Sequence, residues 1–181
     1  MKRIAARLAA ALPLLLLPAP AWTQDNGEND PEAPAWREAA YTLPPLPNER
    51  DLAAFPVAFY PAGRFLLDTG SLAAGEDGVI RYVLVARSKS GAESLTFEGI
   101  RCATAERRLY ASAGRDGQWR PFKNSAWQTL GDSGKDPRVA LAYGYFCDGP
   151  APARSREEII ARLRNNRIDL DYLDPVRGIQ P

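Results

Sequence analysis

Residues 79–102 read VIRYVLVARSKSGAESLTFEGIRC, with two strand-like stretches, 79–87 and 95–102, on either side of a polar connection. Valine, isoleucine, tyrosine and phenylalanine recur in both stretches, and such β-branched and aromatic residues are enriched in strands. The connection contains Lys89-Ser90-Gly91, a composition typical of a short turn. The segment therefore predicts a β-hairpin.

Further strand-like segments lie on both sides of this hairpin, at residues 55–60, 64–68, 107–112 and 118–122. The last two flank Gly114-Arg115-Asp116-Gly117, which is a second hairpin signal. Because no helical pattern separates these strands, the sheet should be antiparallel.

Two helices are expected after the strands. The first covers residues 138–146 and begins after Pro137, a residue favoured in the first turn of a helix. The second begins at Ser155, which has the capping-box spacing to Glu158. Its apolar face would comprise Ile159, Ile160 and Leu163. The predicted fold class is α+β: a mainly antiparallel β-sheet with one or two C-terminal helices packed against it.

The N-terminus has the three-part pattern of a secretory signal peptide. Basic residues at positions 2, 3 and 7 precede an apolar run at 8–17 and a small-residue end at 18–21. We expect cleavage between Ala21 and Trp22. The apolar run is too short to span a bilayer and is interrupted by Pro13. The expected location is the periplasm or the medium, with no membrane span after cleavage.

Composition divides the chain into a signal peptide at 1–21, a disordered leader at 22–40, a β-rich domain at 41–150, and a helix and C-terminal tail at 151–181. The leader is polar and cannot bury enough apolar surface to fold. The proline-rich segment 43–47 should be an extended strap leading into the domain.

The mature chain contains two cysteines, Cys102 and Cys147. In an oxidising compartment such a pair is expected to form a disulfide. The bond would join the first predicted helix to the strand that ends at Cys102.

Charge and composition exclude several functions. The signal peptide holds three basic residues and no acidic one, so cleavage leaves 20 basic against 22 acidic residues, a net charge of about −2. Without a basic stripe, a nucleic-acid partner is not expected. The chain has no histidine, which excludes His-based nucleophile systems and His-ligated zinc sites. No cofactor-binding loop is present, so neither a cofactor nor a metal is expected.

One motif suggests an enzyme. Residues 66–71, LLDTGS, match the signature of aspartic peptidases, in which two such carboxylates share a proton. A chain with one motif must dimerise, so Asp68 would be the catalytic residue of a homodimer. The later aliphatic pair before a glycine in those peptidases is not found here. The simpler interpretation is a strand that ends in an Asp-initiated turn.

Other candidates are weaker. Four aromatic residues could form a ligand platform, although at this density they are more often core: Trp119, Trp127, Tyr143 and Tyr145. Glu76 and Asp77 are interpreted as solvated surface, because they lack the spacing of a calcium loop.

Several segments resemble the cryptic neisserial protein family. They are 55–57, 65–68, 71–72, 77–85, 91–92, 97–102, 109–111, 116–119, 127 and 145–147, of which Glu98-Gly99-Ile100-Arg101-Cys102 is the most specific. The resemblance covers about residues 41–150. It implies an exported protein of Gram-negative bacteria without an established activity, and it supplies no catalytic residues.

The sequence therefore predicts a non-enzymatic interaction or structural domain of the periplasm or envelope, with an envelope protein or a glycan as partner. The alternative is a carboxylate-dependent hydrolase centred on Asp68.

Overall fold

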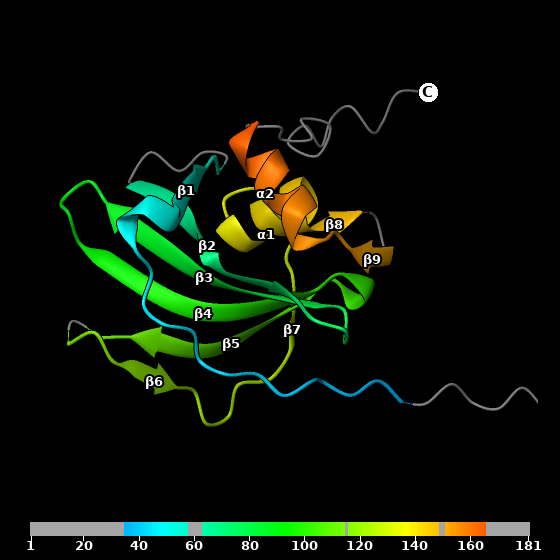
Figure 1. Cartoon of the computed structure of the whole chain (residues 1–181). Coiled ribbons are helices and arrows are strands. Elements are labelled where there is room, and N and C mark those ends of the chain that lie inside the picture. The colour runs from blue at the N-terminus through cyan, green and yellow to red at the C-terminus, as the bar shows by residue number, and fades with distance from the viewer. Residues whose placement is uncertain (1–34, 58–62, 115, 149–150, 166–181) are drawn as a thin grey trace, which may run out of the picture. The chain divides into compact units, whose positions relative to one another are not determined.

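The computed structural model describes residues 35–57, 63–114, 116–148 and 151–165. The predicted signal peptide, residues 22–34 of the predicted leader and the predicted tail from residue 166 lie outside the described residues. The main element is a seven-stranded antiparallel sheet in the order β1-β2-β3-β4-β5-β6, with β7 also paired to β5 (Figure 1). Its strands are β1 (Leu52–Phe55), β2 (Gly63–Ala74), β3 (Val79–Ser88), β4 (Glu93–Arg101), β5 (Glu106–Ala113), β6 (Trp119–Pro121) and β7 (Gln128–Thr129).

The predicted central hairpin is confirmed as β3 and β4. The two strands pair from Val79 opposite Arg101 to Arg87 opposite Glu93. The turn contains Gly91 at a φ of 83°, a conformation that side chains with a Cβ rarely adopt. Because β3 is apolar almost throughout, residues 79–85 are buried on both faces of the sheet.

Two strand predictions differ from the structure. The segment predicted at 55–60 contributes only Phe55, since β1 begins earlier, and residues 58–60 are outside the described part. The segment predicted at 64–68 is longer, because β2 continues to Ala74. Asp68 does not end the strand. Its carboxylate accepts a hydrogen bond from the Gly70 amide at 3.1 Å, within an irregularity that lets β2 resume pairing with β3 at Ala73.

The C-terminal elements cover one face of the sheet (Figure 1). They are α1 (Pro137–Leu141), the π-helical segment η3 (Ala142–Phe146), β8 (Cys147–Asp148), β9 (Ala151–Ala153) and α2 (Arg156–Arg164). The predicted helix at 138–146 is thus α1 with η3. The capping box of Ser155 and Glu158 is present at the start of α2. The predicted α+β class is confirmed.

The helices form the larger hydrophobic core with the sheet. From the sheet it includes Leu67, Ile80 and Tyr82, and from the C-terminal elements Phe146 and Ile159. The side chain of Arg156 on α2 donates hydrogen bonds to the carbonyl oxygens of Thr69 and Leu72, at 3.0 and 3.1 Å. The helix is therefore attached to the edge of β2 beyond the end of β1.

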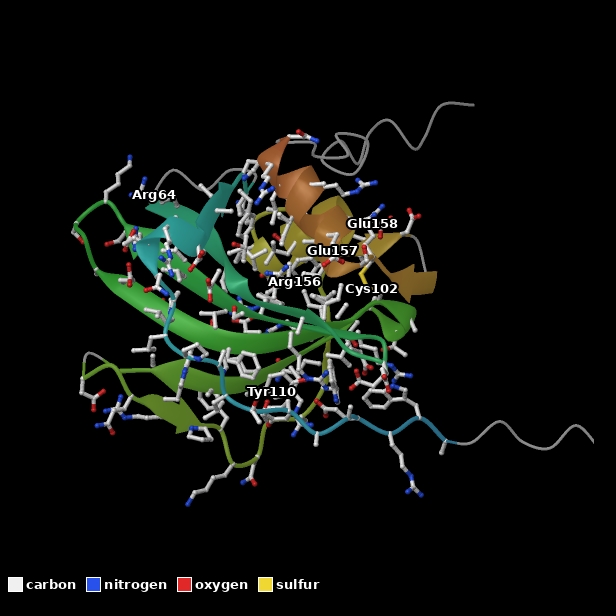
Figure 2. The ribbon with its side chains drawn as sticks, in the orientation of Figure 1. Arg64, Cys102, Tyr110, Arg156, Glu157 and Glu158 are labelled. Carbon is white, nitrogen blue, oxygen red and sulfur yellow. A yellow bond between two sulfur atoms is a disulfide. The ribbon has the colours of Figure 1, made fainter. Side chains whose placement is uncertain are left out.

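The predicted disulfide joins Cys102 and Cys147, whose Cα atoms lie 5.5 Å apart. Cys102 begins the 3₁₀ turn η2 (Cys102–Thr104) after β4, and Cys147 begins β8. Figure 2 shows the bond at the end of the sheet, next to the C-terminal elements. It connects the two layers covalently.

The opposite face of the sheet is crossed by residues 36–48, which we call the strap (Figure 1). The strap has no helix or strand and leads through the 3₁₀ turn η1 (Glu49–Asp51) into β1. The prediction placed residues 36–40 in the disordered leader, but they contact the sheet through Trp36, Glu38 and Ala39. Side chains at both ends of the strap fix it, as described next.

Candidate functional site

The strap lies over a second, smaller cluster of buried residues on the outer face of β2 to β5. The side chains that hold the strap come from the four strands β3 to β6, from the turn between β2 and β3, and from the segment after β6. We call them the strap-binding face: Asp77, Arg81, Phe97, Arg108, Tyr110, Trp119 and Trp127.

The carboxylate of Glu38 is the most heavily bonded group of the strap. Arg108 and the Tyr110 hydroxyl donate to it at 2.5 Å, Trp127 Nε1 donates at 3.3 Å, and Arg81 donates at 3.5 Å. The side chain of Glu38 is only 15% exposed. Burial raises the pKa of Tyr110, and the hydrogen bond to Glu38 raises it further. The Tyr110 hydroxyl therefore stays protonated and acts as a donor.

Gly99 makes room for this arrangement. A Cβ at position 99 would lie 2.5 Å from the Tyr110 hydroxyl oxygen and 3.0 Å from the ring carbon that carries it. Tyr110 on β5 therefore extends across the glycine of β4. Figure 2 shows Tyr110 on the strap side of the sheet. Any larger residue at 99 would displace the ring that binds Glu38.

Asp77 binds the strap through the backbone amide of Ala39 and the indole N–H of Trp36. Its Oδ2 accepts from the Ala39 amide at 2.8 Å and from Arg81 at 2.7 Å, and its carbonyl accepts from Trp36 Nε1 at 2.8 Å. The expectation that Asp77 is solvated surface is wrong, because its side chain is 3% exposed. Burial by itself raises the pKa of Asp77, but hydrogen bonds from Arg81 and from the Ala39 and Val79 amides outweigh it and leave the pKa lowered.

Aromatic side chains of the sheet contact the strap at Tyr41 and Pro44. The Tyr41 ring lies 4.2 Å from that of Tyr110 and 5.9 Å from that of Phe97, centroid to centroid. Trp119 packs beside Phe97 and donates from Nε1 to the Pro44 carbonyl at 2.7 Å. The predicted extended strap at 43–47 is thus bound at Pro44 through an indole N–H, next to the ring contacts of Tyr41.

The four aromatic platform candidates do not meet. Trp119 and Trp127 are both half-buried on the strap side, where Trp127 makes an edge contact with Trp36 at 5.9 Å. Tyr145 is buried in the helix-side core and Tyr143 packs against that core. The structure therefore separates the candidates into two pairs on opposite faces.

Two hollows flank the strap. One, of about 700 Å³, is lined by strap residues including Tyr41 and Pro44 and by sheet residues including Ser71 and Arg81. The other, of about 690 Å³, lies between Leu46 and the turns of the β3–β4 and β5–β6 hairpins. The outer face is thus wider than the segment that covers it.

A second group of charges lies on the helix side of the sheet. Glu98 is 0% exposed and receives two hydrogen bonds from Arg138, at 2.6 and 2.7 Å. Tyr82 and Thr96 also donate to this carboxylate. Burial, and then the charge of Glu98, raises the pKa of Tyr82 well above its usual value. This group attaches α1 to β4 in the core and lines neither of the two hollows beside the strap.

Asp68, the catalytic residue of the alternative hypothesis, is 3% exposed. A Cβ placed on Gly70 would lie 3.2 Å from Asp68 Oδ1 and 3.7 Å from Asp51 Oδ2, so a second carboxylate borders the same glycine. Thr69 of the motif donates to the Asp51 carbonyl at 2.8 Å. Within the described residues no group of three or more acidic or cysteine side chains is arranged to hold a metal.

Glu38, Arg108 and Arg138, which form the closest ion pairs of these two sites with their partners, were not predicted from the sequence. Arg81 and Glu98 did have a signal, since each is a charged residue inside an apolar strand. Such a residue must be exposed or paired. Asp77 lies within four positions of Arg81, but the partner of Glu98 could not be predicted from spacing, because Arg138 is 40 residues away.

The fold and this site define a disulfide-bonded α+β domain whose outer sheet face is covered by its own N-terminal strap. The chain belongs to the CNP1-like family, whose model matches residues 31–164. It is 30% identical over 146 residues to Cryptic neisserial protein 1 of Neisseria gonorrhoeae, covering 71% of each chain. No solved structure matches the chain significantly. The family resemblance of the sequence is confirmed, and the match begins before the strap.

None of the described helices is long and apolar enough to cross a membrane.

Replacing Asp77 with asparagine should weaken strap attachment and change its pH dependence. The pKa of Asp77 in the folded state lies below 3.8, its ordinary value. Its stabilising contribution is therefore present above about pH 3.8 and is lost as the pH falls through the folded-state value. At pH 7 we expect Asp77→Asn to lower the free energy of unfolding by about 1.5–3 kcal/mol, the range for hydrogen bonds to charged groups.

Urea unfolding at pH 7, 5 and 3 would measure this difference. The gap between wild type and Asp77→Asn should shrink at pH 3. Asp132→Asn, in an exposed loop, is the matched control and should follow wild type at all three values. An unchanged gap at pH 3 would contradict the assignment.

Proposed function

We propose that the chain is an exported protein of the periplasm or envelope, and that its domain acts by binding an envelope protein or glycan rather than by catalysis. The signal-peptide pattern at residues 1–21 supports export. The bond between Cys102 and Cys147 fits the same compartment, since disulfides persist in oxidising surroundings.

Exposed apolar side chains carry the proposal of binding. Among the described residues, large hydrophobic side chains are exposed at Trp36 (36%), Tyr41 (41%), Leu43 (38%), Leu46 (38%) and Phe122 (45%). Four of these five belong to the strap. Scattered exposed apolar residues are ordinary, but a concentration on one short segment is typical of an interaction surface.

Site-specific photo-crosslinking in intact cells would test this. A photoreactive residue at position 43 should give a discrete adduct in the envelope fraction. The same residue at the exposed position Glu157 on α2 should not. Recovery of the mature chain from the periplasmic fraction would test the location. Absence of any adduct specific to position 43 would argue against a strap-mediated interaction.

A hydrolase centred on Asp68 is the second candidate, favoured by the Asp51 carboxylate beside the same glycine. The purified mature chain should not hydrolyse denatured protein substrate between pH 3 and 6, and Asp68→Asn should behave identically. Hydrolysis by wild type that Asp68→Asn abolishes would replace the binding proposal with this one.

A further inference from the structure

We propose that the strap-binding face is a recognition site for an extended, acidic, proline-containing segment of another protein, and that the strap occupies this site in the same chain. The inference deepens the proposed function and depends on it for the partner being an envelope protein. It specifies the chemistry of that partner.

Several of the contacts that hold the strap are made to its backbone. Sheet side chains contact its backbone: Arg81 donates to the Ala39 carbonyl at 3.3 Å, and Trp119 donates to the Pro44 carbonyl at 2.7 Å. Asp77 accepts from the Ala39 amide. The strap has no strand pairing of its own. Contacts of this kind recognise an extended backbone, and they would hold another segment of the same shape equally well.

The donors around the Glu38 side chain form what we call the carboxylate pocket. Arg108, Tyr110 and Trp127 donate to Glu38, and Arg81 lies within ion-pair distance at 3.5 Å. These donors select a carboxylate but do not distinguish the chain that supplies it.

The pocket also has donors that the strap leaves unused. Among the described residues, the Nε atoms of Arg81 and Arg108 are buried and have no hydrogen-bond partner. Buried donors without a partner are uncommon and require an explanation. Both atoms belong to the guanidinium groups that bind Glu38, so a ligand carboxylate placed closer to them than that of Glu38 could accept from them.

The strap-binding face also has features that suit a proline-rich segment. An indole N–H directed at a carbonyl of an extended proline-rich segment, beside a row of aromatic rings, is a general mode of polyproline recognition. Trp119 provides the indole N–H for Pro44, and the rings of Phe97 and Tyr110 continue the row from Trp119 to Tyr41. The carboxylate pocket lies on the N-terminal side, so the ligand should carry its acidic residue about six positions before its first proline, the spacing of Glu38 and Pro44.

The hollows on both sides of the strap supply the space. A partner segment could contact Ser71 and Arg81 on one side and Leu95 on the other without rearrangement of the sheet. Because the strap is tethered, its effective concentration is of the order of millimolar. A free peptide must therefore compete with it, and weakening the strap should increase peptide binding.

The experiment uses the full mature chain and a fluorescent synthetic peptide of residues 35–48. Glu38→Ala with Tyr41→Ala weakens the strap but leaves the strap-binding face intact. The peptide should bind this variant about tenfold more tightly than wild type, since charge-assisted hydrogen bonds to the strap are lost. Glu157→Ala, an acidic-to-alanine change on α2, is the control and should bind like wild type.

Two further measurements test the site itself. Adding Arg108→Met to the strap-weakened variant, or Glu38→Gln to the peptide, should each reduce binding by about tenfold. Equal binding by wild type and the strap-weakened variant, or binding insensitive to both changes, would overturn the proposal.

Hydrogen exchange of the wild-type chain provides a test that needs no variant. If the strap can leave its site, the Ala39 amide should exchange by local opening, about a hundredfold faster than the amides of β3. Equal protection would mean that the face is exposed only on global unfolding, and the proposal would fail. A failed peptide assay alongside a crosslink from position 43 would refute this site while leaving the proposed function intact.

Discussion

Reduction of the Cys102–Cys147 bond is expected to lower the free energy of unfolding by about 4 kcal/mol, if loop-closure entropy dominates. The bond closes a loop with a sequence separation of 45 residues. It also joins β4 to the C-terminal elements that cover one face of the sheet. Since small domains are stable by only about 5–15 kcal/mol, this loss is a large fraction of the whole.

Urea unfolding with and without reductant would measure the effect. Cys102→Ala with Cys147→Ala should match the reduced wild type and should not respond to reductant. The unfolded, unreduced wild type should titrate no free thiol. A urea midpoint that reductant leaves unchanged would contradict a stabilising role for the bond.

Replacing Arg138 with methionine should destabilise the domain by about 3–5 kcal/mol, the range for a buried ion pair that loses one partner. Glu98 is 0% exposed and would keep only the hydroxyl donors of Tyr82 and Thr96. Methionine preserves most of the length of the side chain, so the effect would come mainly from the unpaired carboxylate. Unfolding in urea at pH 7 is the measurement.

The double variant Glu98→Gln with Arg138→Met is the decisive control. Removing both charges should be less damaging than removing Arg138 alone, because no buried carboxylate is left without its counterion. A double variant as unstable as the single one would show that packing, and not charge pairing, explains the loss.

The strap joins the two functional proposals. The strap carries four of the five exposed large apolar side chains of the described residues, and it occupies a site in which, in the same part of the chain, two arginine Nε atoms have no hydrogen-bond partner. If a partner displaces the strap, Trp36, Tyr41, Leu43 and Leu46 leave the face together with Glu38. The crosslinking experiment tests the exposed side chains of the strap, and the peptide experiment tests the strap-binding face.

The parts of the fold that were predictable from the sequence are those that depend on local patterns. The apolar run of β3, the glycine-containing turn before β4 and the capping box of α2 each depend on neighbouring residues, and each is present. The disulfide followed from the count of two cysteines and the expected compartment. The end of β1 and the course of β2 through Asp68 were not predictable, because a side-chain hydrogen bond to Gly70 decides whether the strand continues.

The sequence by itself determined the class of the fold, its central hairpin, the cysteine pair and the family. These depend on periodicity, turn chemistry and composition, which act over a few residues. Only the tertiary structure decided that Glu38 meets Arg108 and that Glu98 meets Arg138, across 70 and 40 residues. Many arginines and glutamates of this chain could pair, and their local sequence is the same whichever partner they find. The pairing is decided when the strap and the C-terminal elements pack on the two faces of the sheet and bring particular charges together away from water. There an unpaired charge is too unfavourable to persist.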